Sequence, residues 1–140
     1  MGKINYGRVV LGGLVAGLVL NIGELVLNMQ ILARDWDEAM KSLNRPPMGG
    51  IAPVVFIILC FALGILLTWV YAAIRPRFGA GPKTAICAAL VVWTLAYAWP
   101  SVSGMVMDVF PSRLFLIGML WGLLEVPIAS LAGNWFYREA

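Results

Sequence analysis

Four long runs of apolar residues dominate the chain, and short polar segments separate them. Each run has about two dozen residues, and a helix needs about 20 to cross the hydrocarbon core of a bilayer. Barrel strands alternate apolar and polar residues, whereas these runs do not. The pattern predicts an all-α protein, a bundle of four transmembrane helices with short loops that forms one domain over residues 1–140. The predicted spans are Val9–Leu32, Ile51–Ile74, Thr84–Met107 and Leu114–Tyr137.

Composition supports a polytopic membrane protein. Hydrophobic residues make up 61% of the chain and charged residues 12%, whereas a soluble domain is about half apolar and about a quarter charged. The first run is too long for the apolar region of a signal peptide and has no small-residue cleavage site after it. We therefore expect the first run to remain as a membrane anchor, and we expect no separate soluble domain.

Basic residues are distributed unequally between the two ends of the predicted spans. Six of them flank the termini and the loop between the second and third spans: Lys3, Arg8, Arg75, Arg77, Lys83 and Arg138. The positive-inside rule then places both termini in the cytoplasm and the loop of residues 35–47 outside. The net charge of +3 is thus explained by topology, and we expect no nucleic-acid partner.

The loop between the first two spans predicts a short interfacial helix. Asp35 is placed to cap its first turn, and Glu38 three residues later completes a pattern like a capping box. Pro46 and Pro47 are expected to end the helix. One face is expected to lie in the lipid headgroups and consists of Trp36, Met40 and Leu43. An ordered polar loop is the alternative.

Polar residues inside the first span raise the question of function. Their spacing of three or four residues places them on one helix face, which comprises Gly13, Gly17, Asn21, Glu24 and Asn28. The fourth span has a stripe of the same spacing, with Gly118, Gly122, Glu125 and Ala129. Small residues allow membrane helices to approach closely, and polar side chains bond between them. Both stripes are therefore expected to face protein.

Glu24 and Glu125 are predicted to share one polar site. At 1.5 Å per residue, Glu24 lies about 12 Å and Glu125 about 16 Å below the same outer surface. Asn21 on the first span and Thr94 and Tyr97 on the third are placed to supply hydrogen bonds. Two adjacent carboxyl groups cannot both ionise easily. The site is either structural, with protonated and hydrogen-bonded acids, or a site that handles protons or cations.

Other chemistry has little support in the sequence. The chain has no histidine, the commonest general base and metal ligand. Cys60 and Cys87 fall at different depths, so neither a disulfide nor a shared metal site is expected. Met105 and Met107 form a thioether pair of a kind that suits Cu(I), although methionine also fills apolar gaps. We expect no cofactor and no enzymatic activity.

The basic loop between the second and third spans has two interpretations. Its residues Arg75, Arg77 and Lys83 would hold the topology of the chain, or they would bind anionic lipid headgroups. The loop has glycines near a lysine but does not match the phosphate-binding pattern of a Walker A loop.

Several segments carry a resemblance. The segments "GRVVLGGLVAGLVLNIGELVLN", "DWDEAMKSLNRPPMGG", "YAAIRPRFGAGPKTA" and "GLLEVPIASLAGNWFYRE" resemble small four-span membrane proteins of bacteria that have no assigned function. The resemblance implies a protein of the bacterial inner membrane and implies no catalytic role.

Two functions from different classes follow. The first is an accessory or structural membrane protein that acts through helix contacts, either as a homo-oligomer or as a subunit of a larger complex. The glycines off the main stripe, Gly12 and Gly23, would supply a second close-packing face for such contacts. The second is a small proton- or cation-coupled carrier or channel that uses Glu24 and Glu125.

Overall fold

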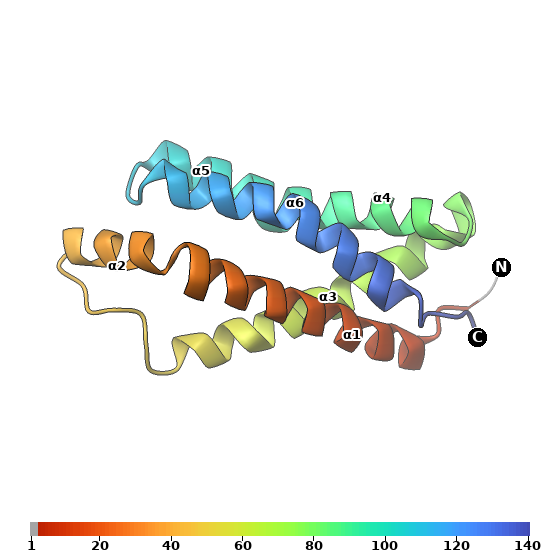
Figure 1. Ribbon diagram of the computed structural model, residues 1–140. Coiled ribbons are helices and arrows are strands. Elements are labelled where there is room, and N and C mark those ends of the chain that lie inside the picture. The colour runs from red at the N-terminus through yellow and green to blue at the C-terminus, as the bar shows by residue number, and fades with distance from the viewer. Residues whose placement is uncertain (1–2) are drawn as a thin grey trace.

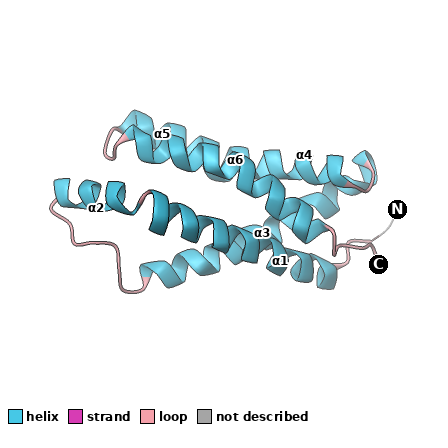
Figure 2. Cartoon of the chain, in the orientation of Figure 1, coloured by secondary structure: helices cyan, strands magenta, loops and turns pink. Residues whose placement is uncertain are grey.

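The computed structural model describes residues 3–140, and its secondary structure consists of helices joined by loops, with no strand among these residues (Figures 1 and 2). The prediction of an all-α chain is confirmed. Two of the helical segments are π-helical and are labelled η1 and η2. The elements in chain order are α1 (Tyr6–Val26), η1 (Leu27–Ile31), α2 (Ala33–Ser42), α3 (Ala52–Phe78), α4 (Pro82–Trp93), η2 (Thr94–Ala98), α5 (Trp99–Met107) and α6 (Ser112–Asn134).

Four continuous helical stretches are long and apolar enough to cross a membrane, as predicted. They are Tyr6–Ile31, Ala52–Phe78, Pro82–Met107 and Ser112–Asn134. Their bounds differ from the predicted spans at several ends. The first begins at Tyr6 because the Asn5 side chain accepts a hydrogen bond from the Arg8 backbone N–H at 3.1 Å and caps the helix. The third begins at a proline, which suits the first turn of a helix.

The last helix ends three residues before the predicted bound. Asn134 closes α6, and Tyr137 turns back toward α3, where its ring packs edge-on against Tyr71 at 5.8 Å between centroids. The Tyr137 hydroxyl also accepts a hydrogen bond from the Asn5 backbone N–H at 3.4 Å. These contacts join both ends of the chain to α3. The two termini lie at one end of the molecule, which we call the terminal end, and α2 lies at the other, the α2 end (Figure 1).

The first and third spans each contain one π-helical turn. The first, η1, continues α1, and the second, η2, joins α4 to α5, whose second residue is Pro100. Proline has no N–H and clashes with the preceding turn of a regular helix. The third span nevertheless stays continuous through Pro100. π-helical turns are rare and are frequently found at functional sites.

A short helix does follow the first span, but the prediction that Asp35 caps it is wrong. α2 begins at Ala33 after Leu32, with no side-chain cap, and it ends at Ser42, before the prolines. Asp35 instead forms an ion pair with Arg113 at 3.3 Å, and Glu38 forms one with Arg34 at 2.8 Å. The expected lipid-facing position of Trp36 is also wrong. Its ring packs edge-on against Phe110 at 5.7 Å, in a cluster with residues of α6.

Close contacts of glycine set the distance between α1 and its two neighbours. On the α3 side, a side chain at Gly64 would collide with the α1 backbone at Gly13 and Gly17. On the α6 side, Gly12 and Gly133 face each other in the same way, since a side chain on either would meet the carbonyl oxygen of the other. Gly12 therefore does not offer a free face to a second copy of the chain, contrary to the sequence interpretation. α1 lies between α3 and α6 (Figure 1).

Candidate functional site

The two acids of the membrane-length helices, Glu24 and Glu125, meet at one hydroxyl group. The Tyr97 hydroxyl lies 3.0 Å from Oε1 of Glu24 and 3.3 Å from Oε2 of Glu125. The three residues come from α1, η2 and α6, so the contacts join three of the four membrane-length stretches. Neither glutamate forms an ion pair with a basic residue within the described chain, residues 3–140.

Tyr97 reaches the acids because of two local features. It lies in the π-helical turn η2, and its ring packs directly on α6 at Gly122, where a side chain would collide with the ring. The absence of a side chain at Gly122 therefore lets the hydroxyl pass α6 and reach Glu24 on α1. The tyrosine is only partly buried, as expected for a ring that lies between helices.

Glu24 receives a second hydrogen bond from its own span. The Asn28 side-chain amide donates to Oε2 of Glu24 at 2.9 Å and to the Glu24 backbone carbonyl at 2.9 Å. The Trp36 indole N–H on α2 donates in turn to Oδ1 of Asn28 at 3.0 Å. A chain of hydrogen bonds thus runs from the acids to α2. Asn28 lies in η1, so each π-helical turn supplies one hydrogen-bond partner of the acids.

Glu125 is the more buried of the two acids, with 6% of its surface exposed. Its carboxyl group lies against α1 at Gly23, where a side chain would overlap Oε1. The buried indole of Trp121, four residues earlier on α6, lies beside the Glu125 carboxyl, although Nε1 and Oε1 do not meet the geometry of a regular hydrogen bond. Gly23 therefore makes room for an acid of the same chain. It does not supply the free packing face that the sequence predicted.

The geometry restricts how protons can be arranged. A hydroxyl group has one hydrogen to donate and two lone pairs to accept with. Tyr97 can donate to only one of the two carboxyl groups, so its second contact is a hydrogen bond only if that carboxyl is protonated and donates to the phenol oxygen. The arrangement therefore accommodates one proton shared between two acids. Such carboxyl groups at membrane depth are rare and mark ion or proton sites in many membrane proteins.

Two of the residues predicted to join the site lie elsewhere. The Asn21 side-chain amide donates to the backbone carbonyls of Gly17 at 2.9 Å and of Ile57 on α3 at 3.3 Å. The Thr94 hydroxyl donates to the Leu90 carbonyl of its own helix at 2.7 Å and is exposed. The prediction that they bond to the acids is wrong. The residues that the prediction omitted are Asn28, Trp36 and Trp121, of which Asn28 already stood on the polar stripe of the first span.

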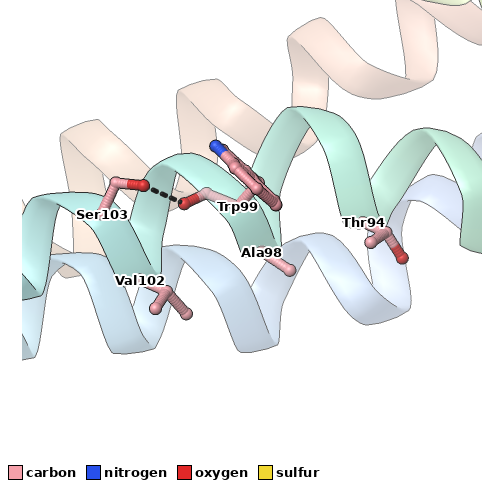
Figure 3. A pocket seen from close by; sticks show the side chains of 5 residues that line it. All are labelled: Thr94, Ala98, Trp99, Val102 and Ser103. Atoms are coloured by element: carbon pink, nitrogen blue, oxygen red, sulfur yellow. Dashed lines mark hydrogen bonds between the residues drawn. The ribbon is translucent and has the colours of Figure 1, made fainter.

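Thr94 lines a shallow groove of about 330 Å³ on the surface of η2 and α5, shown in Figure 3. The groove also has Ala98, Trp99, Val102 and Ser103 along it. The Ser103 hydroxyl donates to the Trp99 carbonyl at 2.9 Å, as the dashed line in Figure 3 marks. Both hydroxyl groups are thus bonded to their own helix and offer no free donor to a ligand.

The geometry does not support a Cu(I) site at the methionine pair noted in the sequence. Met105 and Met107 are two residues apart on α5, and residues at that spacing point to opposite sides of a helix. Cys60 and Cys87 are both free thiols. Among residues 3–140 there is no group of three or more cysteine or acidic side chains placed to hold a metal ion.

The three basic residues of the predicted headgroup site differ in their surroundings. The Arg75 guanidinium lies over the Tyr137 ring at 5.5 Å and 3.7 Å from the Glu139 carboxylate. Arg77 and Lys83 are exposed at the terminal end. Arg75 thus contacts the C-terminal segment, whereas the side chains of Arg77 and Lys83 are exposed.

Comparison with known proteins gives no relative from which a function could be transferred. The chain matches no protein-family model, no curated protein sequence and no solved structure.

Proposed function

We propose that this chain is an integral membrane protein that holds one exchangeable proton between Glu24 and Glu125, as a small proton- or cation-coupled carrier or channel. The observation that carries the proposal is the position of the Tyr97 hydroxyl, within 3.0 and 3.3 Å of both carboxyl groups. The four membrane-length helices support the location of this site inside a bilayer. The proposed role requires no enzymatic reaction.

The hydrogen-bond partners favour one arrangement of the proton. Glu24 has two donors, Tyr97 and Asn28, and donors stabilise the ionised form of a carboxyl group. Glu125 is buried and has an oxygen without a partner, and burial disfavours an ionised carboxyl group. In the proposed resting state Glu125 is protonated and donates to Tyr97, and Tyr97 donates to ionised Glu24. The Trp36 indole and the Asn28 amide hold Glu24 in place and do not carry the proton, because an indole N–H donates a hydrogen bond and accepts none.

The proposed location is the inner membrane of a bacterium, with the terminal end in the cytoplasm. The excess of basic residues near the termini and the loop that contains Arg75 and Lys83 supports this orientation. A reporter enzyme that is active only in the cytoplasm, fused after Ala140, would be active. Activity of a periplasm-specific reporter at the same position would reverse the orientation and place α2 in the cytoplasm.

Two measurements on protein in lipid nanodiscs and liposomes test the proton site. Infrared spectroscopy should detect a protonated carboxylic acid whose band is absent in E125Q. The assignment is direct because the acids other than Glu24 and Glu125 lie outside the membrane-length helices: Asp35, Asp37, Glu38, Asp108 and Glu139. Liposomes with the wild-type protein should dissipate an imposed pH gradient faster than liposomes with E125Q or without protein. A band that persists in both E24Q and E125Q contradicts the proposal.

An accessory role is the second candidate, and one feature of α3 favours it. Seven consecutive residues at its α2 end, 53–59, are exposed on every side, although a helix that packs in a bundle buries one stripe. Contact with a partner protein or a second copy would cover this segment. Wild-type liposomes that retain the gradient as long as protein-free ones, together with a stable partner on purification, would favour this candidate over the carrier.

A further inference from the structure

Charged side chains are divided unequally between the two ends of the molecule (Figure 1). At the α2 end the acidic side chains equal the basic ones in number; they are Asp35, Asp37, Glu38 and Asp108 against Arg34, Lys41, Arg45 and Arg113. At the terminal end a single acidic side chain, that of Glu139, stands against six basic ones: Lys3, Arg8, Arg75, Arg77, Lys83 and Arg138. The excess of positive charge therefore lies entirely at the terminal end.

The fold neutralises the single acid of this end and leaves the other charges free. The Glu139 carboxylate lies 3.7 Å from the Arg75 guanidinium, which also covers the Tyr137 ring. The remaining basic residues are exposed, and none of them forms an ion pair within residues 3–140. We call them the basic patch, and they are Lys3, Arg8, Arg77, Lys83 and Arg138. Arg75 thus leaves the headgroup site predicted from the sequence, and three residues near the termini join it.

Contacts between three segments make the basic patch one connected surface. The Tyr71 hydroxyl of α3 accepts a hydrogen bond from the Gly81 backbone N–H at 3.1 Å, which joins the α3–α4 turn to α3. The Tyr71 ring packs against Tyr137 of the C-terminal segment. The Ala140 backbone N–H of that segment donates to the Lys3 carbonyl at 3.3 Å. The free charges therefore lie on segments that are fixed to one another.

The α3–α4 turn holds two members of the basic patch on either side of a defined backbone. Gly79 and Gly81 have φ angles of +83° and +131°, which favour glycine. The Thr84 hydroxyl donates to the Gly79 carbonyl at 2.7 Å and closes the turn. Arg77 precedes this turn and Lys83 follows it. Two exposed cations are thus held near one short turn.

Exposed aromatic rings accompany the basic patch. Phe78 at the end of α3, Tyr6 at the start of α1 and Trp135 after α6 are 61%, 67% and 84% exposed. Each lies within three positions of a patch residue in the sequence. Aromatic side chains are enriched at the level of the lipid headgroups, where their rings meet both apolar and polar surroundings. The basic patch therefore lies at headgroup level when the four helices cross a bilayer.

We propose that the basic patch binds anionic phospholipids, with lipid phosphate groups on Arg77 and Lys83 at the α3–α4 turn. Each anionic headgroup supplies the negative charge that this end lacks, and basic residues at the membrane surface attract such lipids. The exposed rings contact the glycerol region of the same lipids, a contact that an acidic soluble protein would not offer. The inference goes beyond the proton site and does not depend on it.

Native mass spectrometry of the detergent-purified protein tests the proposal with two lipids that have the same acyl chains. Phosphatidylglycerol is the anionic probe, and phosphatidylcholine is the zwitterionic one. In titrations, the wild-type protein should bind phosphatidylglycerol about tenfold more tightly, the effect of one or two basic residues near a headgroup. R77Q/K83Q should lose most of this preference. Its infrared band from protonated Glu125 should remain, because the substitutions are far from the acids.

A matched control comes from the other end of the molecule. Lys41 and Arg45 are exposed and form no ion pair within residues 3–140, so K41Q/R45Q removes the same two charges at the α2 end and should keep the preference. Without lipid, both double variants should unfold at the wild-type temperature. If R77Q/K83Q does not, R77Q and K83Q are measured singly, and each should lose part of the preference. Equal binding of the two lipids by the wild type, or the same loss in both double variants, overturns the inference.

Discussion

Glu24 and Glu125, on two antiparallel helices and 101 positions apart in the sequence, reach the same hydroxyl group. The Tyr97 oxygen is 3.0 Å from one carboxyl and 3.3 Å from the other. Three neighbouring residues make this contact possible. Gly122 admits the tyrosine ring, Gly23 admits the Glu125 carboxyl, and Asn28 orients Glu24. The first predictions concern these residues.

Replacing Tyr97 by phenylalanine should separate the two acids. Y97F keeps the ring that packs on Gly122 but removes the hydroxyl, which leaves two carboxyl groups without their common partner. Loss of a hydrogen bond with a buried group left unsatisfied costs about 1–3 kcal/mol. Thermal unfolding of the purified protein in detergent should therefore occur at a lower temperature. Y6F is the matched control, because Tyr6 is 67% exposed and should tolerate the change.

A single added methyl group at Gly23 should displace Glu125. The new β-carbon of G23A would overlap Oε1 of Glu125, so either the acid or the α1–α6 contact must move. The expected result is a loss of stability in thermal unfolding and a weaker infrared band from protonated Glu125. The double variant G23A/E125A removes the overlap, so the effects of the two substitutions should be clearly non-additive.

Gly118 supplies the control for that experiment on the neighbouring helix. A side chain there meets nothing within 4 Å, and alanine is favoured over glycine inside a helix by about 1 kcal/mol. G118A should therefore be neutral or slightly stabilising. Equal destabilisation by G23A and G118A would mean that the space beside Glu125 is not what makes Gly23 necessary.

The depth of the two acids could be predicted from the sequence, since it depends only on the regular rise of a helix. Of the three expected partners only Tyr97 contacts the acids, and the others could not be predicted correctly in part because two π-helical turns change which side chains align. In a regular helix Thr94 and Tyr97, three residues apart, would share a face. Both lie in η2, where Thr94 turns to the surface while Tyr97 turns inward.

The position of Asn21 was misjudged for a different reason. Gly17, Asn21 and Glu24 do lie on one side of α1, but α1 has two neighbours on that side. Asn21 bonds to the Ile57 carbonyl of α3, whereas Glu24 meets Tyr97 of η2. A stripe of polar residues in the sequence shows that a face is buried by protein. It does not show which helix covers each turn of that face.

Trp36 should hold α2 against the rest of the molecule. W36F keeps an aromatic ring against Phe110 but loses the indole N–H that donates to Asn28 at 3.0 Å. The expected loss of stability is about 1 kcal/mol, and the amides of α2 should exchange hydrogen faster in mass spectrometry. The matched control is W99F, since Trp99 lies exposed on α5. Unchanged exchange in α2 of W36F would show that its apolar contacts alone hold this helix.

The two acids should respond differently to replacement by glutamine, which mimics a protonated carboxyl group. In E125Q the new amide can donate to the Tyr97 oxygen as the protonated acid is proposed to do, so the unfolding temperature should stay close to that of the wild type. In E24Q the charge is lost, and an NH2 group takes the place of one of the two oxygens to which Tyr97 and Asn28 donate. Leaving one of these donors without an acceptor should cost about 1–3 kcal/mol.

The comparison is made by thermal unfolding of both variants in the same detergent, with E24Q/E125Q as the third sample. If Glu125 holds the proton, the double variant should be about as unstable as E24Q alone. The reason is that replacing protonated Glu125 by glutamine exchanges one neutral hydrogen-bond donor for another. A larger loss in E125Q than in E24Q would assign the proton to Glu24 instead. Equal and small losses of stability in E24Q and E125Q would mean that the hydrogen bonds between Tyr97 and the two acids contribute little to the stability of the fold.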